Sequence, residues 1–160
     1  MQRARIPRNE FAKASFDEVL GDLAEGAIEH EVKMFESVYI ENLGGGEFEL
    51  HQLPMAAQTA PAFGILPRDW NGDGHMDILL AGNYYEREIE TTRSDAGIGT
   101  MLLGDGKGGF NPISPSENGI MAYLDVRSLA TVENSQKQPL VLILNNNFGM
   151  QVYEGQSVEQ

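Results

Sequence analysis

Residues 37–154 alternate between short apolar runs and turns rich in glycine or acidic residues. The apolar runs are roughly four to eight residues long, which is the usual length of β-strands, and leucine, isoleucine and valine fill them. Glycine-rich turns join two pairs of these runs, and this predicts two hairpins. The predicted strand segments are 37–53 (two strands), 62–69, 75–83, 99–113 (two strands), 123–132, 139–147 and 150–154. The pattern predicts a mainly β chain.

The segment before residue 37 has a different, helical spacing of apolar residues. Ser15 and Glu18 form a potential capping box, and it opens a stripe made of Phe16, Val19, Leu20 and Leu23, extended less regularly by Ile28, Val32 and Phe35. Two glycines interrupt the stripe, each at a cost of about 1 kcal/mol relative to alanine, so we expect a broken or two-part helix. We expect the stripe to pack on the chain's own domain. A partner-binding face is the alternative.

Two landmarks recur at the same interval in the β region. A Gly-Gly motif precedes both Phe48 and Phe110, which are 62 positions apart. The apolar runs that end at Asn83 and Asn145 are also 62 positions apart. A repeat built from short strands and glycine hairpins predicts a β-propeller blade.

Composition narrows the classes of partner. The formal net charge is -13, so the chain repels nucleic-acid phosphates and anionic lipid, and we expect neither as a partner. The absence of cysteine excludes disulfides and thiolate metal sites. No apolar run reaches the ~18–20 residues of a membrane span, and no signal-peptide core is present. We therefore expect no membrane insertion, and we expect an exported parent protein to carry its signal upstream.

The stretch 69–83, DWNGDGHMDILLAGN, places oxygen-bearing side chains at alternating positions. Its potential ligands are Asp69, Asn71, Asp73 and Asp77, with the backbone carbonyl of His75 between the last two. Calcium is a hard cation that binds six to eight oxygen atoms, and alternating side chains on a curled loop can converge on it. The stretch therefore predicts a Ca²⁺ site.

This loop has alternative interpretations. Zinc is disfavoured because the chain has no cysteine and because His75 stands where a backbone carbonyl is expected to bind. Magnesium can compete for the same oxygens, and a metal-free turn held by Asp and Asn side chains is a further alternative. Without a cation, we expect the crowded carboxylates to repel one another, which raises their pKa values or disorders the loop. An EF-hand is excluded, because position 12 is Leu80 rather than an acid and the flanking runs are strand-like.

The second repeat has no such loop. We align Asp125 with Asp69, and the segment DVRSLATVE that begins there lacks the alternation of acids. We therefore expect a metal-free second blade, in which Arg127 fills some of the space of the cation.

The order strand, D-x-N-x-D-G-x-x-D, strand and G-D-G-K-G-G-F resembles the FG-GAP or VCBS repeat of integrin-type propellers. The amino-acid sequence of residues 53–83 and 102–110 is most similar to VCBS repeats of secreted bacterial proteins of the ASPIC/UnbV-associated kind. The resemblance covers about residues 37–154. It implies Asp69, Asn71, Asp73, His75 (carbonyl) and Asp77 as calcium ligands. It also implies a secreted, cell-surface or periplasmic location and a role in adhesion or recognition.

The expected organisation has three parts: a polar start and helical segment at 1–36, about two propeller blades at 37–154, and a tail at 155–160. A closed propeller needs about four to eight blades, so two blades leave open sheet edges. We expect flanking blades of the same parent chain to cover these edges. Self-association, or cover by the N-terminal helix, is the alternative.

The expected function is a recognition scaffold for a protein or a glycan. The segment 83–99 is long for a hairpin connection, and it carries Tyr84, Tyr85, Arg87, Arg93 and Asp95 as a potential recognition surface. The alternative is a disordered insertion. We expect no catalytic residue, because His30, His51 and His75 are far apart and belong to no recognisable catalytic motif. Part of a propeller-type polysaccharide-active enzyme is the alternative function.

Overall fold

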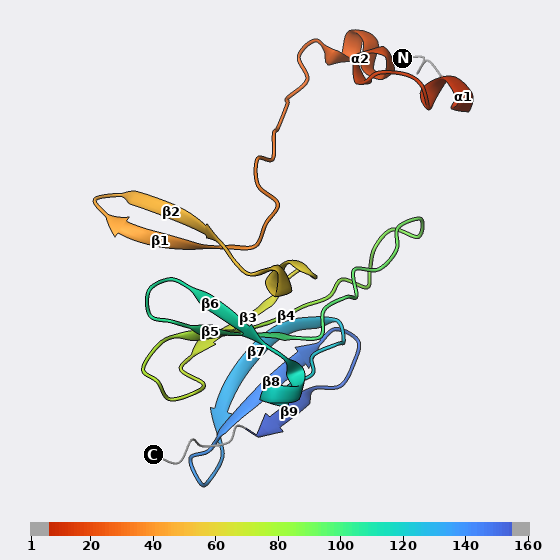
Figure 1. Ribbon diagram of the computed structural model, residues 1–160. Coiled ribbons are helices and arrows are strands. Elements are labelled where there is room, and N and C mark those ends of the chain that lie inside the picture. The colour runs from red at the N-terminus through yellow and green to blue at the C-terminus, as the bar shows by residue number, and fades with distance from the viewer. Residues whose placement is uncertain (1–6, 155–160) are drawn as a thin grey trace. The chain divides into compact units, whose positions relative to one another are not determined.

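The computed structural model describes residues 7–154 (Figure 1). The first six residues and the predicted tail at 155–160 lie outside this range. The chain divides into two compact units, Met1–Phe35 and Glu36–Gln160, and each is described by itself. Within residues 7–154, no helix has the length and apolar character needed to cross a bilayer.

The first unit contains α1 (Arg8–Phe11), α2 (Phe16–Leu20) and the 3₁₀ helix η1 (Gly21–Ala24). The predicted capping box is confirmed: the Glu18 amide donates to Ser15 Oγ, and the Ser15 amide donates to the Glu18 carboxylate. The helix breaks at Gly21, as expected. Its predicted extension through Ile28 and Val32 is wrong, because Gly26 takes a left-handed φ of 86° and the chain beyond it is not helical. The packing of the apolar stripe stays a prediction.

The second unit begins with a two-stranded antiparallel sheet. Strand β1 (Val38–Gly44) pairs with β2 (Glu47–Gln52) across a turn of glycines with positive φ, which only glycine adopts at little cost. The pairing sets Glu41 opposite Glu49 and Tyr39 opposite His51. These four side chains share one face of the hairpin, because alternate residues of a strand point to the same side.

A four-stranded antiparallel sheet follows, after the short 3₁₀ helix η2 (Met55–Gln58). Its strands lie in chain order: β3 (Gly64–Arg68), β4 (Asp77–Ala81), β5 (Thr100–Gly104) and β6 (Phe110–Ile113). The acidic loop connects β3 to β4, and the long segment 82–99 connects β4 to β5. These two connections therefore leave the sheet at opposite ends of β4.

The helix α3 (Pro115–Asn118) leads to a three-stranded sheet of β7 (Val126–Glu133), β8 (Pro139–Asn145) and β9 (Gln151–Glu154). Each predicted strand segment thus contains a strand. Over residues 7–154 the fold is mainly β, with nine strands in three antiparallel sheets.

The main core forms between the second and third sheets. Leu79 and Met101 come from the four-stranded sheet, and Val126 and Ile143 come from the three-stranded sheet; all four are at most 3% exposed. Burial of each such side chain contributes about 1.5–3 kcal/mol. A smaller cluster around Leu102 joins the first hairpin to the second sheet, through Tyr39 and Phe110.

The strands follow the 62-residue interval seen in the sequence. Strand β4 begins at Asp77 and β8 begins at Pro139, 62 positions later. The alignment of Asp69 with Asp125 is wrong, however, because Asp69 follows β3 whereas Asp125 precedes β7. The counterpart of the acidic loop is the shorter turn 134–138 between β7 and β8.

Candidate functional site

The acidic loop is folded by its own side chains. Asp69 accepts hydrogen bonds from the amides of Gly72 (2.7 Å) and Gly74 (2.9 Å), one on each carboxylate oxygen. Both glycines have positive φ, 77° and 86°, which a residue with a Cβ rarely adopts. The first predicted ligand therefore curls the chain that follows it.

Asn71 and Asp73 form the middle of the loop. The Asp73 amide donates to Asn71 Oδ1 (3.0 Å), and Asn71 Nδ2 donates to Asp73 Oδ2 (2.9 Å). The His75 amide donates to Asp73 Oδ1 (2.8 Å), and this bond and the Asn71 amide lower the pKa of the Asp73 carboxyl. The expectation of a raised pKa is wrong for Asp73, because N–H donors of the loop stabilise its charge.

Asp77 is the buried anchor of the loop, with 0% exposure. Its carboxylate accepts from the Trp70 amide (2.8 Å) and from the Gly104 amide (2.9 Å) at the end of β5. Two N–H donors offset part of the cost of burying this group. Through the Gly104 amide, Asp77 joins the loop to β5 as well as to its own connection.

His75 places its ring against the β5–β6 turn, where a Cβ at Gly106 would collide with the imidazole. Its amide bonds to Asp73. The predicted role of its carbonyl as a ligand stays a prediction.

The oxygen donors of the loop suit calcium by their chemistry. Asp69, Asn71 and Asp73 offer carboxylate and amide oxygens that are at least partly exposed. A carboxylate has about four acceptor positions, of which N–H donors of the loop occupy two on Asp69 and two on Asp73. The N–H groups of the loop therefore hold these oxygen atoms in a curled arrangement, and each carboxylate keeps free acceptor positions for a cation. The predicted ligands lie in one hydrogen-bonded loop, but the carboxylate oxygens of Asp69, Asp73 and Asp77 do not converge to within 4.8 Å of one another.

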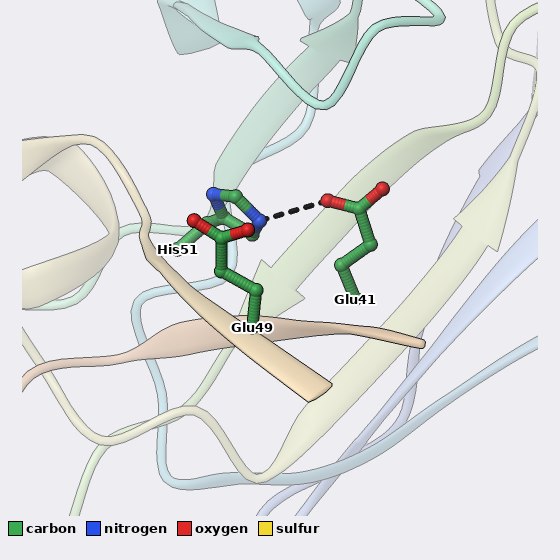
Figure 2. Close-up of side chains that lie close together, drawn as sticks. All are labelled: Glu41, Glu49 and His51. Atoms are coloured by element: carbon green, nitrogen blue, oxygen red, sulfur yellow. Dashed lines mark hydrogen bonds and ion pairs between the residues drawn. The ribbon is translucent and has the colours of Figure 1, made fainter. Parts of the chain in front are cut away.

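A different group has closer ligand atoms. Among the described residues, the ligand atoms of Glu41, Glu49 and His51 all lie within 4.8 Å of one another (Figure 2). These three residues were not predicted from the sequence to lie together. The alternation of residues on either side of the glycine turn could have indicated this group. Once the register is known, Tyr39 lies opposite His51 and Glu41 lies opposite Glu49.

The long segment 82–99 is an ordered hairpin at its base. Tyr84 and Ser94 form an isolated antiparallel bridge, with backbone hydrogen bonds of 2.8 and 3.0 Å. The alternative of a disordered insertion is therefore wrong for this part of the segment. Figure 1 shows the segment extending beyond the ends of β4 and β5.

The predicted recognition residues pair with one another on this hairpin. The Arg87 guanidinium lies 5.7 Å from the centre of the Tyr84 ring, and that of Arg93 lies 5.0 Å from the centre of the Tyr85 ring. These are cation–π distances. Asp95 is exposed. Four of the five predicted residues are thus arranged as two stacked pairs.

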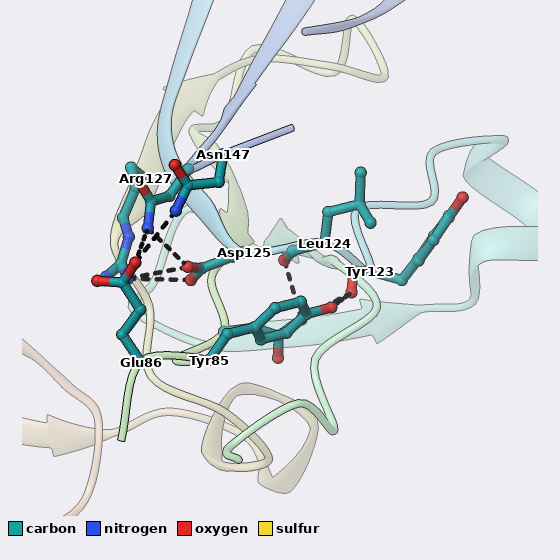
Figure 3. A network of polar contacts seen from close by, with 9 residues as sticks. Tyr85, Glu86, Tyr123, Leu124, Asp125, Arg127 and Asn147 are labelled. Atoms are coloured by element: carbon teal, nitrogen blue, oxygen red, sulfur yellow. Dashed lines mark hydrogen bonds and ion pairs between the residues drawn. The ribbon is translucent and has the colours of Figure 1, made fainter. Parts of the chain in front are cut away.

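Tyr85 ties this hairpin to the segment before β7 and to the β8–β9 turn (Figure 3). Its hydroxyl donates to the Tyr123 carbonyl (2.9 Å), and its ring meets Phe148 edge to face at 6.0 Å. Glu86 accepts from the side-chain amides of Asn146 (3.3 Å) and Asn147 (3.1 Å). The base of the hairpin is therefore held by contacts to residues that the sequence analysis did not single out.

Arg127 lies beside this hairpin and not in a cation site. It forms an ion pair with Asp125 (3.1 Å), which is 1% exposed. Its guanidinium also lies over the rings of Phe63 (4.6 Å) and Tyr84 (5.4 Å). The expectation that it fills the space of a second calcium is wrong, because the counterpart of the acidic loop lies at the other end of β7.

Asn83 fixes the point where the hairpin leaves the sheet. It is 0% exposed; its Nδ2 donates to the carbonyls of Gly97, Tyr123 and Leu124, and its Oδ1 accepts from the Gly97 amide. Sequence reasoning recognised Asn83 only as a landmark of the repeat. Its buried position at a strand end is what marks it as the link between the long hairpin and the third sheet.

Comparisons of the chain with known protein families, with curated proteins and with solved structures found no match.

Proposed function

We propose that this chain is a calcium-binding β-propeller repeat module of a secreted, cell-surface or periplasmic protein, and that it acts as a recognition or adhesion scaffold for a protein or a glycan. The observation that carries the proposal is the placement of the two unusual loops of the four-stranded sheet. The oxygen-rich loop and the long hairpin leave that sheet at opposite ends of β4. One end is suited to hold a cation and the other to meet a partner.

The metal part of the proposal assigns the ion to the β3–β4 loop. Asp69, Asn71, Asp73, Asp77 and the carbonyl of His75 would hold it. Bound calcium would supply positive charge that offsets the carboxylates and would stiffen the connection. The chain contributes the curl of the loop, through amide donors to Asp69 and Asp73, and its anchorage to β5, through Asp77.

The propeller part of the proposal rests on the pattern of the sheets. Two, four and three strands follow one another, each sheet antiparallel and in chain order. This sequence matches the end of one blade, a whole blade and most of a third. Strands β1 and β9 are edge strands among the described residues, and such edges pair readily with further strands. Flanking blades of a parent chain are the proposed cover, with self-association as the alternative.

The recognition part of the proposal assigns the partner to the long hairpin. Arginine presents a planar, permanently charged group that binds carboxylates, and tyrosine offers a flat face to sugar rings or side chains. Arg87 and Arg93, each stacked on a tyrosine, are exposed. The same segment carries four acids, Glu86, Glu88, Glu90 and Asp95. The two arginines therefore suit individual carboxylates of a partner, on a glycan with uronic acids or on a protein surface, rather than a dense field of negative charge.

A binding screen tests this assignment. The chain is applied to an array of neutral and uronic-acid oligosaccharides and to a panel of immobilised acidic and basic proteins, with the variants Arg87→Ala and Arg93→Ala. We expect each variant to weaken binding to an acidic target by about fivefold, because the contact of an exposed arginine with a carboxylate of the partner is worth roughly 1 kcal/mol.

The matched control is Lys107→Ala, which removes an exposed cation from the β5–β6 turn instead. It should bind as the unaltered chain does. Equal binding by all three variants, or no binding to any acidic target, would remove the hairpin from the proposal.

A further inference from the structure

We propose that Glu41, Glu49 and His51 form a binding site for a divalent transition-metal ion of the Zn²⁺ class on the first hairpin, distinct from the acidic loop. The site is independent of the calcium proposal, since the residues lie on β1 and β2 and share no member with the β3–β4 loop.

The hairpin register brings the three side chains together. Glu41 stands directly opposite Glu49, and His51 is two residues along β2 from Glu49, on the same face. Figure 2 shows the Glu41 carboxylate directed at the imidazole and the Glu49 carboxylate beside it. His51 Nε2 lies 2.9 Å from Glu41 Oε2, and the ligand atoms of all three lie within 4.8 Å of one another.

The imidazole is the fixed member of the group. Its ring stacks on Tyr39, with 4.7 Å between ring centres and 13° between planes. Tyr39 in turn meets Phe110 of β6 edge to face at 5.6 Å. The nitrogen ligand is thus held by packing, whereas the two exposed glutamates have rotatable chains that can close on an ion.

The donor set distinguishes this group from the acidic loop. A neutral imidazole nitrogen suits zinc, copper, nickel and related ions, whereas calcium and magnesium prefer oxygen ligands alone. Zinc binds nitrogen and carboxylate oxygen at about 2.0–2.2 Å, so bound ligands are roughly 3–4 Å apart. The observed spacing needs only a small movement of the glutamates. Zinc is usually four-coordinate, so three protein ligands at an exposed site leave one coordination position for water.

The charges around the group favour a cation. Two carboxylates directly opposite each other on a hairpin repel, and a bound ion removes this repulsion.

Calorimetric titration of the whole, tag-free chain with Zn²⁺ tests the inference, in calcium-containing buffer so that the acidic loop is supplied with its own ion. We expect one zinc per chain, and we expect His51→Gln and Glu49→Gln each to weaken the affinity by at least about tenfold. His75→Gln and Asp73→Ala, which alter the acidic loop, should change it by less than about twofold.

Far-UV circular dichroism of each variant shows whether the β structure is intact. His51→Gln removes the ring that stacks on Tyr39 and can disturb the hairpin. Glu49→Gln keeps the size and shape of an exposed side chain, so its zinc affinity tests the site without that disturbance. Unchanged zinc affinity in Glu49→Gln overturns the three-ligand site. A loss in His75→Gln as large as that in His51→Gln also overturns it, since zinc would then bind the acidic loop.

Discussion

Asn83 and Asp77 are both fully buried polar side chains, and both use their hydrogen-bonding capacity on the backbone. Asp77 accepts from one amide of the β3–β4 loop and one at the end of β5, and Asn83 binds three carbonyls and one amide from two distant segments. A buried polar group of this kind specifies where segments meet, because no apolar side chain can satisfy the same backbone atoms. These two residues set the positions of the loops at the two ends of β4.

Replacement of Asn83 by alanine should therefore be costly. The change leaves buried carbonyls without donors, and we expect a loss of about 2–3 kcal/mol in the free energy of unfolding, measured by urea denaturation. Asn111→Ala, at an exposed position of β6, is the matched control and should cost less than about 0.5 kcal/mol. A similar loss in both variants would contradict the role assigned to Asn83.

Asp73 and Asp105, two exposed aspartates in turns, should make the free energy of unfolding depend on pH in the acidic range. Amide donors from His75 and then the Asn71 side chain lower the pKa of Asp73, and the amides of Lys107 and Gly109 lower the pKa of Asp105. A lowered folded-state pKa stabilises the fold fully above the unfolded value of about 3.9, and this contribution is lost as the pH falls through the folded value.

The free energy of unfolding can be measured by urea denaturation from pH 2 to pH 6, with a chelator present. We expect it to be constant above about pH 5 and to fall as the pH is lowered toward 2. Asp105→Asn should show a smaller fall over the same range than the unaltered chain. An identical acid dependence in the two proteins would show that the turn amides do not stabilise the carboxylate of Asp105.

At the scale of elements, the local sequence pattern was sufficient to predict the strands and the capping box at Ser15. Alternating apolar runs and glycine turns define hairpins through short-range geometry, so β1–β2 and β5–β6 could be predicted. The group formed by Glu41 and His51 could not, because it depends on the pairing register. The pair Asp125–Arg127 was also missed, since its place beside Tyr84 depends on how the third sheet meets the long hairpin.

The approach of the long hairpin to the sheet should be sensitive to added volume. A Cβ at Gly82 would collide with the Pro61 carbonyl and stand 2.7 Å from the Phe63 amide nitrogen. We expect Gly82→Ala to lower the free energy of unfolding by roughly 1–3 kcal/mol, measured by thermal or urea denaturation. Gly149→Ala meets no atom within 4 Å and is the matched control. A Gly82→Ala protein as stable as the control would contradict this packing.

At the scale of the whole molecule, a formal charge of -13 accompanies three small sheets and two proposed cation sites. Self-repulsion of a highly charged chain opposes its compact state, and bound cations reduce it. The oxygen-rich loop and the His-containing hairpin would take ions of different classes, because their donor atoms differ. In the proposed function, this acidic β scaffold uses cations for stiffness and presents an arginine–tyrosine hairpin to its partner.

The most direct test of this account is thermal unfolding in calcium and in chelator, for the unaltered chain and for Asp73→Ala. At free calcium 100 times its dissociation constant, binding should add about 2.7 kcal/mol and raise the melting temperature by on the order of 10 °C. Asp73→Ala should lose this rise, and Asp95→Ala, which removes an exposed acid from the long hairpin, should keep it. Equal melting temperatures in calcium and chelator, or a rise that Asp73→Ala retains, would contradict the calcium site at the centre of the account.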